Sequence, residues 1–211
     1  MIHLVDNVNS TNTWLTDFNG NYFDSLLSFK QSEGYGRLGR LWESDIGGLY
    51  YSLVLPHRDI LPILVGVSVA DILVKSKVNI ELKWPNDILV KSKKLGGIIC
   101  HSQDGKTIMG LGININNRTS LDTSTSLSEL GCTIDKLSFI NELIKQIQLN
   151  MNRSNSEIIE QFMTYDCLRG EVVSWKEGKG IVEKISENGR LIVKDNNTNK
   201  SIFLTDEVHL E

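Results

Sequence analysis

The chain has 211 residues and is 40% hydrophobic, which is enough for one large domain or for a medium domain followed by a small one. Its formal net charge of −4 argues against a general nucleic-acid-binding protein, because such proteins are normally basic. Three widely spaced cysteines without a C-x-x-C pair indicate reduced thiols, and four histidines without ligand spacing give no sign of a structural metal site.

Two features of the sequence bear on its location. The first residues, MIHLVDNVNS, lack the basic and apolar regions of a signal peptide. The most apolar window, residues 60–74, contains Pro62 and Asp71 and is shorter than the roughly 20 residues that span a bilayer. We therefore expect a cytoplasmic protein that does not bind membranes.

The pattern of apolar residues predicts both strands and helices over the first 165 residues. Strands are expected at 2–5, 26–30, 49–55, 80–83, 88–90, 95–101 and 107–115, and helices at 13–18, 61–75, 136–151 and 157–165. Asp104 and Gly105 predict a hairpin turn, so that the last three strands form an antiparallel meander.

Two further expectations concern the middle of the chain. Residues 116–126 are rich in Asn, Ser and Thr and are expected to form an exposed loop. The helix at 136–151 is expected to carry Leu137, Ile140, Ile144 and Ile147 on one face.

The pattern changes after Cys167. Residues 170–211 contain five short apolar runs separated by turn residues, which is typical of a small β-barrel. We therefore expect two domains, one over residues 1–168 and one over residues 169–211.

Residues 34–42, GYGRLGRLW, contain the G-x-G-x-x-G pattern of dinucleotide-binding loops. A Rossmann loop is followed by a helix that faces the phosphates, whereas the residues after Gly39 predict a turn and then a strand. Kinase motifs are absent, and Cys100 stands where a P-loop would place its first glycine. The remaining interpretation is a flexible loop whose arginines bind a carboxylate or a phosphate, or a mobile hairpin with solvated arginines.

Lys83-Trp84-Pro85-Asn86-Asp87 ends a predicted strand with a rigid turn. A lysine aimed into a cleft can neutralise charge on an acyl phosphate, although a lysine at a strand end is usually an exposed charge. Asn86 and Asp87 are candidates for holding a metal or a nucleotide, or are turn residues. Glycines in the next two strands indicate a bulge, or the close approach of a ligand or another backbone; they are Gly96, Gly97, Gly110 and Gly112.

The order of these motifs resembles that of the biotin protein ligases. S-T-N, Q-x-x-G-x-G-R-x-G-R-x-W, K-W-P-N-D, K-L-G-G-I and G-x-G-I-N follow one another within residues 6–116, and T-D-E-V-H-L near the end is similar to the last strand of that family. The resemblance implies an α+β fold: a mixed sheet with helices, related to class II tRNA synthetases and lipoate ligases, followed by an SH3-like β-barrel.

The same resemblance implies the reaction. Biotin would be activated with ATP, accompanied by Mg²⁺, to biotinyl-5′-AMP, and biotin would then pass to a lysine of a biotin carboxyl carrier protein. Arg37 and Lys83 would be the catalytic residues, with no protein nucleophile. The implied biotin site comprises Ser10, Thr11, Asn12, Gln31, Gly34, Tyr35, Gly36, Arg37, Lys83, Gly96 and Gly97. The implied ATP site comprises Arg37, Arg40, Trp42, Lys83, Asn86 and Asn114.

Two departures from the family qualify this expectation. Tyr35 stands where many relatives carry an arginine, so the adenylate is held differently if that side chain takes part. The chain starts almost at the strand before S-T-N, which predicts a ligase without the DNA-binding domain that some relatives use for repression. DNA binding is therefore not expected, and a homodimer is left open.

Two other functions compete with this reading. One is a lipoate or octanoate ligase or transferase on the same fold. The other is a nucleic-acid-binding module that uses the arginines and aromatic residues of the glycine loop, against which the acidic net charge argues.

Overall fold

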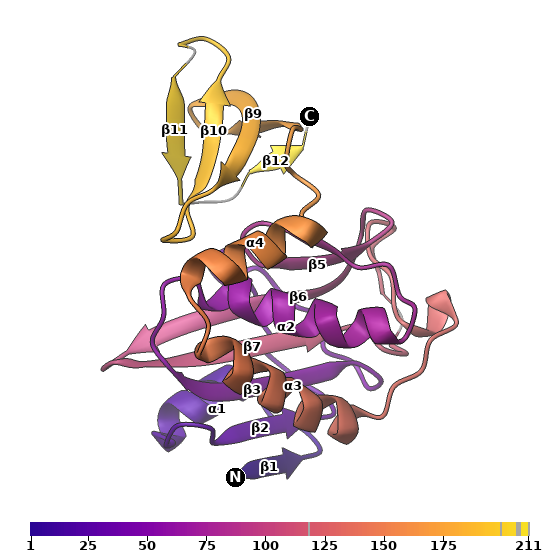
Figure 1. Cartoon of the computed structure of the whole chain (residues 1–211). Coiled ribbons are helices and arrows are strands. Elements are labelled where there is room, and N and C mark those ends of the chain that lie inside the picture. Colours follow the sequence, from indigo (N-terminus) through magenta and orange to yellow (C-terminus); the bar gives the residue numbers. More distant parts are fainter. Residues whose placement is uncertain (118, 199, 206–207, 211) are drawn as a thin grey trace.

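The computed structural model describes residues 1–117, 119–198, 200–205 and 208–210. A seven-stranded mixed sheet forms the body of the molecule, and a five-stranded antiparallel sheet lies beyond α4 at one end (Figure 1). Three residues from the predicted segments lie outside the described residues: Arg118 of the polar loop, and Asp206 and Glu207 of T-D-E-V-H-L.

The large sheet confirms the predicted strands with small shifts in their ends. It comprises β1 (Ile2–Val5), β2 (Ser25–Ser28), β3 (Leu49–Pro56), β4 (Glu81–Lys83), β5 (Asp87–Val90), β6 (Lys93–Gln103) and β7 (Lys106–Ile113), in the order β1-β2-β3-β7-β6-β5-β4. β1 and β2 are parallel, and the other neighbours are antiparallel. Asp104 and Gly105 both have positive φ at the β6–β7 turn, as a two-residue hairpin requires.

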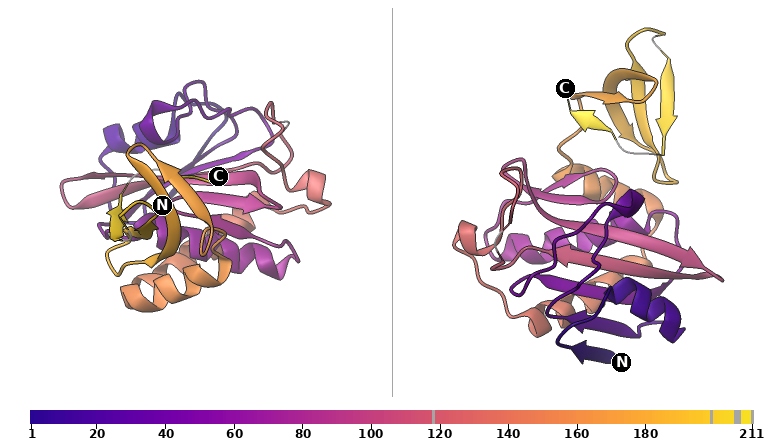
Figure 2. Two further views of the ribbon diagram at one scale, coloured as in Figure 1. Left: turned by 90° about the horizontal axis from the view of Figure 1, so that it is seen from above. Right: turned by 180° about the vertical axis from the view of Figure 1, so that it is seen from behind.

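Helices pack on both faces of this sheet (Figure 2). α1 (Thr11–Phe18) covers one face, and α2 (Leu61–Lys75) covers the other with α3 (Lys136–Met151) and α4 (Asn155–Tyr165) against it. Alternation along β3 separates the two cores: Val54 packs beneath α1, whereas Leu53 and Leu55 belong to the core beneath α2. The side chains of Ser10, Asp135 and Ser154 accept from the backbone and cap the starts of α1, α3 and α4.

Leu137 does not belong to the buried face of α3 and is 46% exposed. The buried residues of that helix are Phe139, Ile140, Leu143, Ile147 and Asn150. At 100° per residue, Leu137 lies roughly 110° away from the centre of this stripe, so it faces away from the sheet. The prediction for Leu137 was wrong because the stripe is centred on other positions.

Among the described residues of the segment 116–126, Asn116 and residues 120–123 are exposed, so the expected exposed loop is confirmed only in part. Asn117, Thr125 and Ser126 are buried. The loop returns alongside the start of β6, where the amide of Lys94 donates to Thr123 O and the amide of Thr125 donates to Lys94 O. These backbone hydrogen bonds hold the end of the loop against the start of β6.

The small sheet contains the five predicted strands. They are β8 (Val172–Trp175), β9 (Gly178–Ile185), β10 (Leu191–Asp195), β11 (Ser201–Leu204) and β12 (His209–Leu210), in the order β11-β10-β9-β8-β12. Within the residues described here β11 and β12 do not pair, so closure into a barrel stays a prediction. Nor does the described part of the chain hold a helix of the length and apolarity that a bilayer crossing needs.

Candidate functional site

A cavity of about 280 Å³ lies where the N-terminus of α1 and the glycine loop meet the middle of β3, β6 and β7. The polypeptide contributes to it from all the motifs that the sequence singled out. The predicted residues that line it are Ser10, Thr11, Asn12, Gln31, Tyr35, Gly36, Arg37, Arg40, Trp42, Lys83, Asn86 and Gly97.

One end of this cavity is polar and uncharged. The Gln31 side chain accepts from the amide of Thr11 (2.8 Å) and from its hydroxyl (3.1 Å), and Thr11 Oγ1 lies 2.8 Å from Ser52 Oγ. Asn12 is 2% exposed, and its Oδ1 has no hydrogen-bond partner among the described residues. A buried acceptor without a partner costs free energy, so this end suits a ligand that donates hydrogen bonds.

The glycine loop forms a narrow hairpin, not the start of a long helix. A single 3₁₀ turn, η1 (Arg37–Gly39), lies at its tip, and the amide of Gly36 donates to Arg40 O at 2.8 Å. Gly34 lies at its base, where an added Cβ would stand 2.7 Å from Trp42 O. The absence of a following helix confirms that this is not a Rossmann loop.

Close contacts explain why the neighbouring strands carry glycine at three positions. A Cβ on Gly112 would lie 2.6 Å from Trp42 Nε1, and a Cβ on Gly110 would lie 2.8 Å from Asn12 Nδ2. Gly96 faces another backbone, since its Cβ would stand 2.7 Å from Gly112 O. Gly112 and Gly110 therefore leave room for side chains of the site, and Gly96 leaves room for the backbone of the neighbouring strand.

Positive side chains form a second group in the cavity wall. Arg37, Arg40, Lys83 and Lys94 all line it, and Asp87 is the one acidic residue among the described lining residues. Arg37 Nη1 donates to Asn86 Oδ1 at 3.5 Å, which joins the glycine loop to the turn after β4. Lys94 Nζ lies 2.7 Å from Asp87 Oδ1 and 5.6 Å from the centre of the Trp42 ring. This positive group suits an anionic ligand.

Tyr50 and Tyr35 belong to the aromatic part of the wall, together with Trp42 and Trp84. The Tyr50 hydroxyl donates to Asp45 O at 2.6 Å, and burial raises the pKa of the phenol, so that it stays neutral. Tyr35 is 39% exposed and lines both the cavity and a larger open cleft beside it. Its phenol thus lies at the boundary between the two spaces.

Three predicted site residues do not line the cavity: Gly34, Gly96 and Asn114. The Asn114 side chain donates to Thr125 O at 3.1 Å and accepts from Asn117 Nδ2 at 3.0 Å, so it holds the 116–126 loop in place. A direct contact between Asn114 and a nucleotide stays a prediction. Motif reasoning overlooked Lys94 and Ser52 as lining residues, although Lys94 precedes the glycine pair that it singled out.

Comparison with known proteins adds independent evidence. The family model described as the biotin/lipoate A/B protein ligase family matches residues 6–117. The chain is 34% identical over 140 residues to the bifunctional ligase/repressor BirA of Bacillus spizizenii, covering 56% of this chain and 43% of that protein. It is 24% identical over 208 residues to the biotin--[acetyl-CoA-carboxylase] ligase of Mycobacterium tuberculosis, covering 88% of this chain and 78% of that one.

A solved structure is similar over the whole chain. The biotin protein ligase of Aquifex aeolicus in complex with biotin and ATP superposes with a TM-score of 0.88 at 31% identity, covering 100% of this chain and 98% of that one. The chain spans about half the length of the first curated relatives it matches.

Proposed function

The chain belongs to the biotin/lipoate A/B protein ligase family, and from this premise we propose that it activates biotin with ATP and transfers biotin to a carrier protein. Biotinyl-5′-AMP would be the intermediate and pyrophosphate the first product. The likeness to the biotin and ATP complex of the Aquifex enzyme supports biotin over lipoate or octanoate as the acid.

The observation that carries this proposal is the polarity of the cavity. Biotin has a ureido ring with two N–H donors and one carbonyl acceptor, an apolar bicycle and a carboxylate at the far end of its chain. The cavity is lined by Thr11, Gln31 and the unpartnered Asn12 Oδ1, and also by four positive side chains. These two groups match the ureido ring and the carboxylate of the vitamin.

We propose that the positive end brings two anions together. A carboxylate and a triphosphate repel each other, so Arg37 and Lys83 would offset this charge before the carboxylate attacks the α-phosphate. Arg40 and Trp42 would serve the ATP side, and Asn86 would hold Arg37 through the 3.5 Å contact. The glycine loop would shield the mixed anhydride from water.

The donor set around Asp87 fits Mg²⁺ bound largely through ATP. Mg²⁺ is usually held by one or two carboxylates together with substrate phosphates, and Asp87 and Asn86 supply one carboxylate and one amide oxygen at the cavity wall. These two residues would hold the ion, which would neutralise phosphate charge during adenylation. Their oxygens now contact Lys94 and Arg37, respectively.

The second half-reaction needs no nucleophile from this chain. The acceptor lysine would attack the acyl carbon of the adenylate, forming an amide while AMP leaves. We propose a biotin carboxyl carrier protein as acceptor, in line with the name of the Mycobacterium relative. Burial of its sulfur raises the pKa of Cys100 to about 12, so this thiol does not compete at neutral pH.

Three further points belong to the proposal. The sequence-based division into residues 1–168 and 169–211 is kept, with the first part supplying most of the site and the second, an SH3-like domain, contributing Val208 to the cavity wall. We propose a cytoplasmic location because the three cysteines are free thiols. Self-association into a homodimer is left open.

Pyrophosphate exchange tests the proposal directly. The protein is incubated with ATP and labelled pyrophosphate, with biotin, lipoate or no acid. We expect label to enter ATP with biotin alone. Exchange with lipoate but not with biotin would show that the acid is misassigned, and no exchange with either acid would reject the ligase function.

A further inference from the structure

The tip of the β9–β10 hairpin, residues 186–190, is a rigid turn. The amide of Ser186 donates to Arg190 O at 2.9 Å, and the amide of Gly189 donates to Ser186 O at 2.8 Å. The Ser186 hydroxyl accepts from the amide of Arg190 at 3.0 Å. These bonds fix the directions of the carbonyl groups that remain free to accept from elsewhere.

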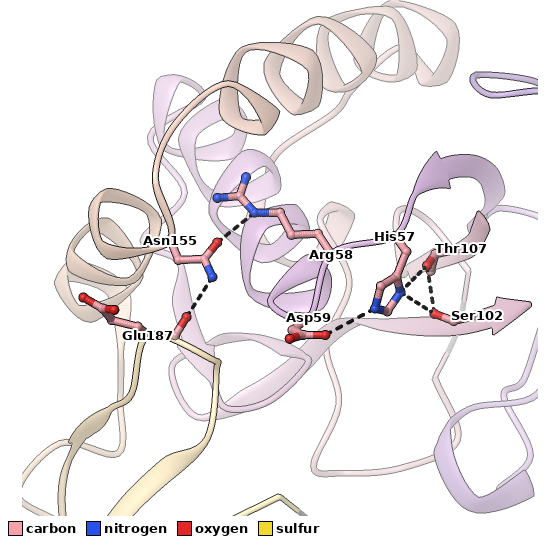
Figure 3. Close-up of polar contacts among 7 residues, drawn as sticks. All are labelled: His57, Arg58, Asp59, Ser102, Thr107, Asn155 and Glu187. Atoms are coloured by element: carbon pink, nitrogen blue, oxygen red, sulfur yellow. Dashed lines mark hydrogen bonds and ion pairs between the residues drawn. The ribbon is translucent and has the colours of Figure 1, made fainter. Parts of the chain in front are cut away.

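Two of those carbonyls accept side chains from the large-sheet part of the molecule. Trp84 is 3% exposed, and its Nε1 donates to Gly189 O at 2.8 Å. Asn155 Nδ2 donates to Glu187 O at 2.8 Å, and Arg58 in turn donates to Asn155 Oδ1 at 2.9 Å (Figure 3). The hairpin is thus held through its backbone at two neighbouring points.

Gly189 also fits closely against the start of α2. It has φ +80°, and a Cβ there would lie 3.2 Å from Ile60 Cγ2 and 3.5 Å from Ile63 Cδ1. A side chain at this position would be strained by its backbone, and its contact with Ile60 would have to open by a few tenths of an ångström. Glycine therefore lets the carbonyl come within reach of Trp84.

Trp84 belongs to the turn that carries Lys83 and Asn86 into the site. On the far side of this turn, Asn86 Nδ2 donates to Ile98 O at 2.9 Å, and the amide of Ile98 donates to Asn86 O at 2.9 Å. The turn is consequently fastened to β6 through Asn86 and to the hairpin through Trp84. The open cleft of about 640 Å³ is walled by this turn, the glycine loop and residues 188–190 together.

We propose that the hairpin tip of the small sheet is a positioning element of the active site. Through Gly189 O and Trp84 it sets the orientation of the turn that presents Lys83 and Asn86. The small sheet is then part of the catalytic unit and not an appended module. What the turn does in catalysis rests on the proposed function, whereas the contact that orients it does not.

Gly189→Ala tests this, with Gly170→Ala as a matched control. Gly170 has nearly the same backbone strain, φ +83°, but an added Cβ would meet nothing within 4 Å. Both variants should lose thermal stability from the backbone strain, and Gly189→Ala should lose more because it also disturbs the contact with Trp84. Gly189→Ala should lower kcat for biotin-dependent pyrophosphate exchange by about tenfold with little change in KM for biotin, because a misplaced turn costs rate more than binding. Gly170→Ala should keep the wild-type kcat.

Trp84→Phe provides a second route to the same contact, since it keeps an aromatic ring and removes the N–H. It should reproduce the loss of kcat, and the double variant with Gly189→Ala should be no slower than the worse single variant, because both remove one contact. Equal kinetics for Gly189→Ala and Gly170→Ala would overturn the proposal, and so would fully additive losses in the double variant.

Hydrogen exchange separates this inference from the proposed function. In Gly189→Ala, the Trp84 indole N–H and the amides of Asn86 and Ile98 should exchange faster than in wild type and in Gly170→Ala. This measurement needs no substrate. It therefore tests whether the hairpin tip orients the turn even if no acid supports pyrophosphate exchange. Unchanged exchange at these three sites would refute the contact outright.

Discussion

Lys94 and Asp87 form an ion pair of 2.7 Å between β6 and β5, at the wall of the cavity. Both side chains are partly exposed, at 38% and 25%. The pair joins the K-L-G-G segment to the end of K-W-P-N-D, and Lys94 also lies over the Trp42 ring. Through these two contacts Lys94 links three motifs, namely K-L-G-G-I, K-W-P-N-D and the glycine loop that ends in Trp42.

We predict that Lys94→Met weakens ATP binding. The substitution removes a positive charge from the cavity and leaves Asp87 without this partner, facing the nucleotide phosphates. KM for ATP should rise about tenfold, which corresponds to roughly 1.4 kcal/mol. The control is Lys75→Met, which removes an ion pair with Glu142 on the outer helices and should leave KM for ATP unchanged. An unaltered KM for ATP in Lys94→Met would show that this lysine does not meet the nucleotide.

Lys83→Ala should slow adenylate formation. Removing one group that stabilises developing charge typically costs about 10²- to 10³-fold in kcat. Biotin affinity should change much less, because the ureido end of the site is untouched. Pyrophosphate exchange gives the rate, and calorimetric titration with biotin gives the affinity. A large loss of biotin affinity with normal kcat would instead make Lys83 a binding residue.

Arg37→Gly should release biotinyl-5′-AMP before transfer. The substitution removes a positive charge that faces the adenylate and the contact to Asn86. The freed anhydride would then react with lysines of unrelated proteins. The measurement is streptavidin blotting of an added bystander protein such as albumin, which wild-type protein should leave unlabelled. If the variant labelled its carrier alone, this role for the glycine loop would be wrong.

Gly112→Ala should destabilise the fold through Trp42. The added Cβ would stand 2.6 Å from the indole nitrogen, so the ring or the glycine loop must move, at a cost of about 1–3 kcal/mol in the free energy of unfolding. Gly66→Ala is the matched control within α2. Its Cβ would find its nearest neighbour at 3.6 Å, and alanine in a helix interior is favoured by roughly 1 kcal/mol. Urea unfolding should give opposite signs for the two variants, and equal stability would reject the role of Trp42.

Much of the secondary structure and most of the site could be predicted because their signals are local. Helix α2 begins and ends where the apolar spacing places it, and Ser154 caps α4 because a hydroxyl there meets amides three residues away. The family motifs likewise place Thr11, Gln31, Arg37 and Lys83 at one cavity, since each motif carries its residue to a strand or helix end.

Leu137 shows where such signals fail, and Asn114 makes hydrogen bonds that such signals do not predict. Both residues fit their patterns, but the neighbours that decide exposure and bonding come from elsewhere in the chain. Leu137 depends on how α3 rests on α2, and Asn114 depends on the return of the 116–126 loop. A side-chain pattern does not encode these distances.

The sequence by itself determined the strands, the helices and the family, because periodicity, caps and motif order are written in neighbouring residues. Tertiary structure alone decided that β7 lies between β3 and β6, which brings Trp42 onto Gly112, and that the carbonyl of Gly189 reaches Trp84. The physical reason is that a backbone carbonyl is common to every residue. Its partner depends on how distant segments pack together, and Trp84 and Gly189 are 105 positions apart in the chain.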